Sequence, residues 1–365
     1  MTGSSISMKG GGYYSKNTQG AKHVIDRAGD HVIEELAGIN NLDDDRPFSI
    51  VDYGAADGGT SMGLVARIVK AVRARAKSRQ ITVTYTDLPH NDFSALFRLM
   101  YDPAMGEEAY VLHNDGVYVN CSGTSFYDQI VPDCSVDIGF SATAMHWLST
   151  LPGCIDDHVH AVGAVGDQWQ TFCNQALEDW CTILARRARE LAPGGRLVMA
   201  NFCIDESGRY LGNTGGVNMF DAFNMLWKEL ADEGVISDAE YQATAFPQFY
   251  KTIDQFAMPF EESDSAVTRE GLRLKTMYTG VTKCPYRAEF DRVGDPVAFA
   301  DAYVPTLRSW SEIVFFGSLD SSRPVEQRRE IVDQLYCNYN TLVRKEPDRH
   351  AMDYVHTYLV AVKER

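Results

Sequence analysis

The chain has 365 residues, with 34 lysines and arginines against 50 aspartates and glutamates, and a formal net charge of −16. Its 45% of hydrophobic residues lies at the average for globular proteins, which excludes a disordered chain or a fibrous repeat. The negative charge argues against nucleic acid and anionic membrane surfaces as partners. The length exceeds what one hydrophobic core usually supports, so we expect a main domain with a large addition.

Targeting signals and cysteines point to the compartment. No apolar run is long enough to span a membrane, and the first residues, rich in Gly, Ser and Tyr, do not resemble a secretory signal. The eight cysteines are scattered without a CxxC pair and are expected to be reduced. Both features favour a cytoplasmic protein.

Hydrophobic periodicity predicts strands that alternate with helices through the first half of the chain. The expected elements there are a helix at 21–39, a strand at 48–54, a helix at 61–76, a strand at 81–87, a helix at 92–100, a strand at 136–141, a helix at 172–191 that stops before Pro193-Gly194-Gly195, and a strand at 196–202. Beyond about residue 205 the strand signal fades, with helices expected at 218–233 and 324–343 and a terminal strand at 356–362. This order is typical of an α/β fold with a doubly wound, mostly parallel sheet.

A glycine-rich turn follows the first strand and reads DYGAADGG from Asp52 to Gly59. It lacks the G-x-G-x-x-G pattern that holds a pyrophosphate. Asp87 ends the next strand, where doubly wound folds place an acid against ribose hydroxyls, although an acid at a strand end can equally cap a helix. A nucleoside with a positive charge and no phosphates fits both features, and S-adenosylmethionine (SAM) is such a ligand. We expect Asp52 to face its methionine end and Asp87 its ribose.

Five short motifs occur in a fixed order along the chain. They are MKGGGYYSKNT from Met8, IVDYGAADG from Ile50, DLPHNDF from Asp87, GTSFY from Gly123 and SATAMHWLS from Ser141. Together they resemble the SABATH family, the salicylate, benzoate and theobromine type of SAM-dependent methyltransferase, and DLPHNDF is the most specific of them. The later EGVI from Glu233 and FPQ from Phe246 are also similar to family motifs.

The resemblance implies a Rossmann-like class I methyltransferase sheet with an added α-helical cap. Its expected parts are a lid segment at 1–20, the SAM-binding domain at 21–204, a mainly helical cap that forms the acceptor pocket at 205–345, and a terminal strand at 346–365 that returns to the sheet. The family also implies a homodimer.

Site residues follow from the resemblance position by position. Those that fall where the family contacts SAM are Tyr14, Thr18, Asp52, Gly54, Asp87, Leu88, Ser125 and Phe126. His146 and Trp147 fall where it holds the methyl acceptor, and Phe220 falls near an aromatic residue of that pocket. Ala21 stands in place of the family's carboxylate-binding glutamine, with Gln19 as a substitute two residues away. A stretch proposed as a metal site reads QATA at 242–245 here, so we expect no metal.

The implied reaction is transfer of a methyl group from SAM to the carboxylate of a small organic acid, giving a methyl ester and S-adenosylhomocysteine (SAH). A carboxylate needs no general base, so holding it in line with the methyl group is the main task. We expect the Trp147 indole N–H to donate to one oxygen and His146 to add a second donor, charged if protonated.

Three alternatives stay open at this point. His146 is also compatible with N-methylation of a small heterocycle. An NAD-dependent oxidoreductase is disfavoured by the missing G-x-G-x-x-G pattern. A non-catalytic SAM-binding protein would account for the departures from the family at Ala21, Ala55 and Thr60.

Overall fold

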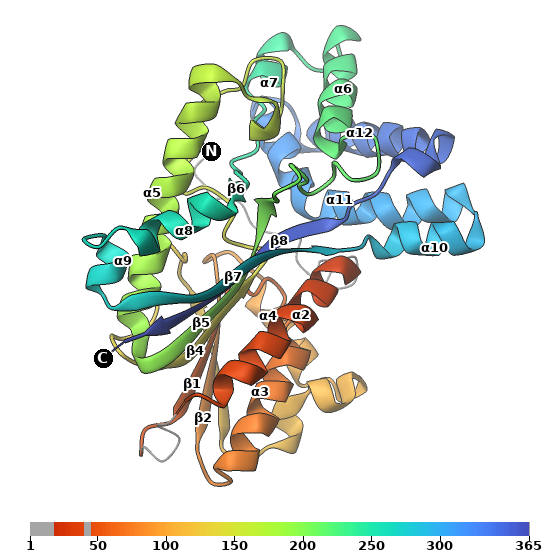
Figure 1. Cartoon of the computed structure of the whole chain (residues 1–365). Coiled ribbons are helices and arrows are strands. Elements are labelled where there is room, and N and C mark those ends of the chain that lie inside the picture. Colours follow the sequence, from red (N-terminus) through yellow and green to blue (C-terminus); the bar gives the residue numbers. More distant parts are fainter. Residues whose placement is uncertain (1–17, 40–44, 365) are drawn as a thin grey trace.

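The computed structural model describes residues 18–39 and 45–364, and a mixed sheet forms the centre of the molecule (Figure 1). Within these ranges its strands follow the order β3-β2-β1-β4-β5-β8-β7, and the short β6 pairs with β5. The strands are β1 (Phe48–Tyr53), β2 (Ile81–Asp87), β3 (Val117–Gly123), β4 (Val136–Ala142), β5 (Leu191–Ile204), β6 (Lys251–Thr252), β7 (Leu272–Thr282) and β8 (Tyr354–Lys363). The first five strands in this order, β3, β2, β1, β4 and β5, are parallel to one another. Strand β8 runs antiparallel to both β5 and β7.

Helices cover both faces of the sheet, as a mostly parallel sheet requires. On one face lie α2 (Gln19–Leu36), α3 (Met62–Arg75) and α4 (Phe93–Met100), and on the other α5 (Gly166–Glu190), α8 (Ile253–Glu261) and α9 (Ala266–Arg269) (Figure 1). The central strand β4 is buried at every position because both of its faces are covered. The α/β class with a doubly wound sheet is therefore confirmed.

A cap lies beyond the carboxyl ends of the parallel strands (Figure 1). It contains α6 (Met219–Asp232), α7 (Asp238–Gln242), α10 (Pro285–Val293), α11 (Pro296–Ser318) and α12 (Val325–Lys345). Short 3₁₀ turns complete the described chain at η2 (Pro103–Glu108), η3 (Tyr110–His113), η4 (Ala161–Gly163) and η5 (Pro347–Arg349). Because parallel strands all end at the same edge, this cap encloses the space above their carboxyl ends.

The expected strands and helices are all present, and three strands were not expected. The first is β3 and the second is β6, which has only two residues. The third, β7, lies inside the segment 205–345 that the sequence assigns to the cap, and it forms one edge of the sheet. Arg273, Lys275 and Thr276 interrupt its apolar pattern, since an edge strand is half exposed and tolerates such residues. That segment therefore contributes to the sheet as well as to the cap.

Two boundaries also differ. Helix α5 begins at Gly166 rather than at 172, and β5 begins directly after it at Leu191. The Pro193-Gly194-Gly195 sequence consequently forms an irregularity within β5, where its register against β4 shifts. All eight cysteines are free thiols in the structure. None of the helices in the described ranges is long and apolar enough to cross a membrane.

Candidate active site

The glycine turn after β1 begins the site, and its backbone requires glycine at Gly54. Gly54 has a φ of +85°, and a Cβ atom there would lie 2.5 Å from the Cβ of Ala144. The turn is held to β2 because the amides of Gly54 and Ala55 both donate to the carbonyl of Thr86, at 3.0 and 2.9 Å. The close approach brings the loop after β4 directly against the end of β1.

The DLPHNDF motif at the end of β2 fastens the same turn. One oxygen of Asp87 accepts a hydrogen bond from the Ala56 amide and the other from the Leu88 amide, each at 2.7 Å. The Asn91 side chain donates to the Ala56 carbonyl at 2.7 Å. Asp92 caps α4 by accepting from Ala95 N at 3.0 Å. The motif thus positions the turn and starts the next helix, and Asp87 keeps lone pairs for a ligand.

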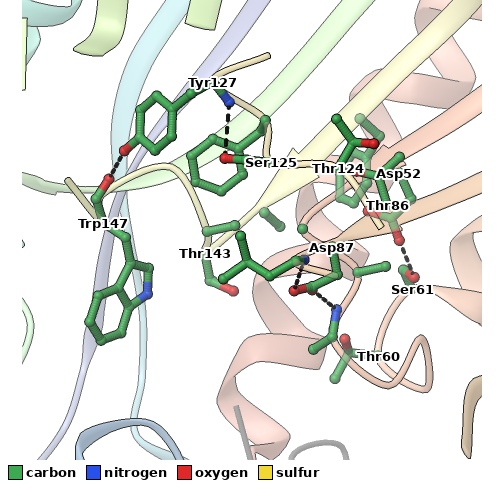
Figure 2. Close-up of a pocket in the computed structure, with 18 of the residues that line it drawn as sticks. Asp52, Thr60, Ser61, Thr86, Asp87, Thr124, Ser125, Tyr127, Thr143 and Trp147 are labelled. Atoms are coloured by element: carbon green, nitrogen blue, oxygen red, sulfur yellow. Dashed lines mark hydrogen bonds between the residues drawn. The ribbon is translucent and has the colours of Figure 1, made fainter. Parts of the chain in front are cut away.

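A pocket of about 900 Å³, open on one side, occupies this edge of the sheet and is shown in Figure 2. Its polar lining residues are Asp52, Thr60, Ser61, Thr86, Asp87, Thr124, Ser125, Tyr127 and Thr143, and its apolar ones include Ile25, Leu88, Phe126, Phe140 and Trp147. We call it the first pocket. Among residues 18–39 and 45–364, two carboxylates and no basic side chain line it, so it favours a cationic ligand.

Asp52 of the first pocket is buried and Asp87 is half-buried, and desolvation raises the pKa values of both carboxylates. Burial raises the pKa of Asp52 to about 7, with Ser61 acting against the shift and Asp87 adding to it. The Ser61 hydroxyl donates to Asp52 at 2.5 Å. Burial likewise raises the pKa of Asp87, against the two backbone amides that it accepts from. A cation bound between them would favour the ionised forms.

The loop after β4 carries His146 and Trp147, and main-chain bonds fix it to a second loop. Leu148 N donates to the Pro247 carbonyl at 2.7 Å, and Phe249 N donates to the His146 carbonyl at 3.1 Å. The Tyr127 hydroxyl donates to the Trp147 carbonyl (Figure 2). The FPQ motif therefore pairs with the loop that carries His146 and Trp147, the His-Trp loop.

A second pocket of about 380 Å³ lies on the other side of Trp147. Its lining comes from distant parts of the chain: Thr18, Thr143, His146, Trp147, Phe202, Leu211, Gln248, Tyr250, Trp310, Met352 and Tyr354. No charged side chain is among them, and Thr143 and Trp147 are shared with the first pocket. The two pockets therefore meet at these two residues.

His146 is neutral at physiological pH in this environment. Burial lowers its pKa well below the usual value, and the neighbouring His356, Lys251 and His160 act in the same direction. Its ring packs edge-on against Phe202 with 4.8 Å between centroids. Of the two states of His146 considered from the sequence, the charged one is disfavoured.

Buried donors face this region without partners. Within residues 18–39 and 45–364, Trp147 Nε1, His146 Nδ1 and the Tyr250 hydroxyl have no hydrogen-bond partner. A buried polar group without a partner costs about 1–3 kcal/mol, so such groups mark places where a ligand can complete the bonding.

The structure brings together most of the residues named from the sequence. Asp52, Gly54, Asp87, Leu88, Ser125, Phe126 and Trp147 line the first pocket, and Thr18, His146 and Trp147 line the second. Thr18, expected to contact SAM, thus lies on the other side of Trp147. Tyr14 lies outside the described residues.

Two residues expected to bind the acceptor lie elsewhere. Gln19 is exposed and lines a separate cavity between α10 and α11. Phe220 is fully buried behind the second pocket, where its ring stacks on His160 at 3.8 Å. Neither lines the second pocket.

Several lining residues were not among the site residues predicted from the sequence. Gln248 stands in the FPQ motif and Tyr250 follows it by two residues in a segment rich in aromatic residues, so both carried a local signal. Trp310, Met352 and Tyr354 carried none, because they reach the pocket only through the packing of α11 and the start of β8. Among the described residues there is no group of three or more His, Cys, Asp or Glu side chains that could hold a metal ion.

Comparison with known proteins identifies the family. The family described as "SAM dependent carboxyl methyltransferase" matches residues 4–364. The chain belongs to this family. It is 26% identical to loganic acid O-methyltransferase from Catharanthus roseus, over 70% of this chain and 72% of that one. It is 28% identical to an indole-3-acetate O-methyltransferase from Oryza sativa subsp. japonica, over 69% and 70%.

Fungal proteins and a solved structure are also similar. The O-methyltransferase acrG of Aspergillus aculeatus is 26% identical over 86% of this chain and 83% of its own. A structure of loganic acid methyltransferase with SAH superposes with a TM-score of 0.77, at 20% identity, over 98% of this chain and 99% of that one. The resemblance, the class I methyltransferase fold and the dependence on SAM are thus confirmed. The oxidoreductase alternative is excluded.

Proposed function

We propose that the first pocket of this SAM-dependent carboxyl methyltransferase holds SAM, and that the second holds a small organic acid whose carboxylate reaches Trp147. The observation that carries this assignment is the junction of the two pockets. They share Thr143 and Trp147, and the indole N–H of Trp147 is buried there without a partner among the described residues.

The residues of the first pocket fit the cofactor. The absence of a Cβ at Gly54 leaves the turn free to approach both the loop after β4 and a bound nucleoside. Asp87 would accept hydrogen bonds from the ribose hydroxyls, and Asp52 would face the positively charged methionine end. Ser125 and Phe126 would contact the remainder of the cofactor. When bound, SAM supplies an electrophilic methyl group that the acceptor carboxylate receives, leaving SAH.

The residues of the second pocket would orient the acceptor. Trp147 Nε1 would donate a hydrogen bond to one carboxylate oxygen. The remaining lone pairs of the carboxylate would then face the first pocket, where the methyl group lies. His146, as a neutral imidazole, would donate or accept an ordinary hydrogen bond. No cationic side chain of the described residues lines the pocket, so none of them would form an ion pair that stabilises the carboxylate and weakens it as a nucleophile. Thr18 would lie at the acceptor.

A methylation screen tests the proposal. The acids would be loganic, indole-3-acetic, benzoic, salicylic and fatty acids, with xanthines added as nitrogen acceptors and the carboxamides of the same acids as controls. Transfer of a labelled methyl group to one or more acids, with none to the matched amides, is the expected result. Methylation of a ring nitrogen only would contradict it.

The proposal includes a homodimer in the cytoplasm, with no nucleic acid or membrane as a partner. Family resemblance supports the dimer, and the net charge of −16 supports the absence of anionic partners. Light scattering of the purified chain tests the first point, and cell fractionation tests the location.

A further inference from the structure

Trp147 and Gln248 form a directly opposed pair between two antiparallel segments. The flanking bonds run from Leu148 N to Pro247 O and from Phe249 N to His146 O. In this arrangement Trp147 and Gln248 make no main-chain hydrogen bond to each other. Their side chains leave the same face of the pair, with Cβ atoms about 4.5–5.5 Å apart. Both side chains line the second pocket. The indole and the amide therefore stand side by side.

Gln248 is buried there with its polar atoms unsatisfied. The residue is 1% exposed, and neither Oε1 nor Nε2 has a hydrogen-bond partner within the described ranges. A primary amide carries two N–H donors, so leaving it buried and unpaired is unfavourable. The same holds for Trp147 Nε1. Two adjacent, unpaired N–H donors match the two oxygens of one carboxylate.

His160 lies near the segment that carries Gln248, because its ring centroid is 5.1 Å from that of Tyr250 and 6.0 Å from that of Phe246. His160 Nδ1 accepts from the Val162 amide at 3.1 Å, so the ring proton is on Nε2. Burial and His158 lower the pKa of His160 well below its usual value, and the Gln248 amide acts in the opposite direction. Within the described ranges neither His160 Nε2 nor the Gln248 amide has a hydrogen-bond partner, so the amide N–H groups remain available to a ligand in the second pocket.

We propose that Gln248 is a specificity-determining residue whose side-chain N–H donates to the second oxygen of the acceptor carboxylate, beside Trp147. The inference rests on the proposed function, because it assumes an acid in the second pocket. It also supplies a donor from a different loop, since Ala21 has none and Gln19 lines another cavity.

The test compares acid and amide binding to the SAH-loaded full chain by calorimetry, with indole-3-acetate and benzoate as acids and indole-3-acetamide and benzamide as neutral probes. Gln248→Glu puts a carboxylate against the acid, so acid affinity should fall about 10- to 100-fold. The amides should lose much less or gain, because a glutamate oxygen can accept their NH₂. SAH affinity should stay within about twofold, as expected for a residue outside the first pocket.

Matched variants separate this role from a structural one. Gln327 is exposed on α12, so Gln327→Glu makes the same charge change at the surface. It should leave the affinities for acid and amide unaltered. Gln248→Met keeps the volume, removes the donor and covers the case in which the glutamate variant does not fold.

The outcomes distinguish the two proposals. Unchanged acid-to-amide preference in both folded Gln248 variants would overturn the role of Gln248 alone. Failure of the unaltered chain to bind either acid would overturn the acceptor assignment together with it. Equal losses of acid and amide in both variants would mark Gln248 as a packing residue and so overturn the inference.

Discussion

Asp52 combines two demands that conflict in the ligand-free protein. It is 3% exposed, and its carboxylate loses hydration on folding while it gains one short bond from Ser61. Its pKa of about 7 means that the folded chain holds an extra proton between about pH 4 and pH 7. Unfolding free energy from this group therefore falls as the pH rises through that window. A bound cation would reverse the effect.

Asp52→Asn should make the ligand-free protein more stable and should weaken the binding of SAM. At pH 8 the ligand-free variant should be more stable than the unaltered chain, by about 4 kcal/mol at most, since each pKa unit corresponds to about 1.4 kcal/mol. Near pH 5 the difference should shrink, because Asp52 is then protonated when folded. Thermal unfolding at both pH values measures it, and SAM should stabilise the variant far less. A variant that is equally or less stable at pH 8 would contradict the burial argument.

Trp147 contributes a ring and a donor, and Trp147→Phe removes only the donor. The KM of the acceptor acid should rise about 10- to 100-fold, as for a hydrogen bond to a charged group, while SAM affinity stays within about twofold. Steady-state kinetics with the best acid of the screen and calorimetry with SAM provide the two readouts. If both affinities fell together, the tryptophan would be needed for the shape of the loop rather than for the acceptor.

At the scale of elements, short sequence motifs form the hydrogen bonds that connect neighbouring segments at the edge of the sheet. The DLPHNDF sequence ties the end of β2 to the glycine turn after β1 and then starts α4, as the bonds of Asp87, Asn91 and Asp92 show. The Asp92 cap spans three residues, whereas the bonds that join Asp87 and Asn91 to Ala56 span 31 and 35 residues and were not predicted from the sequence. The pairing of the His-Trp loop with the FPQ segment spans about 100 residues, and the sequence predicted both motifs but not their contact.

Gly54→Ala tests how closely β1 and the loop after β4 must approach. The new Cβ would stand 2.5 Å from the Cβ of Ala144 at a φ of +85°, so strain and a clash add together. Gly208→Ala is the matched control, since its φ is +74° with no atom within 4 Å of the new Cβ. We expect about 1–2 kcal/mol of destabilisation in the control and clearly more at Gly54, with loss of SAM binding there only. Equal unfolding free energies would refute the close approach.

At the scale of the whole molecule, the charge opposes the proposed acceptor. The chain carries a net charge of −16, and none of the residues that the structure describes brings a cation to the second pocket, so an anionic acid approaches against the overall field. Raising the salt concentration from about 0.01 to 0.15 M shortens the screening length from about 30 to 8 Å and should lower the KM of the acid by about twofold. The binding of the neutral carboxamide should not depend on the salt concentration. Cationic SAM should bind more weakly as the salt concentration rises. A KM that rises with salt would indicate an attractive local potential.

The sequence by itself determined the layered α/β class, the glycine turn with Asp52 and Asp87, and the family, because these depend on periodicity and on residues close together in the chain. It did not determine β7, whose half-exposed residues alternate too weakly, or the walls of the second pocket. Trp310, Met352 and Tyr354 line the same pocket as Trp147 because the cap packs over the carboxyl ends of the strands in the folded chain. Burial likewise made His146 neutral and left Gln248 unpaired, since desolvation depends on what packs around a group and not on its neighbours in sequence.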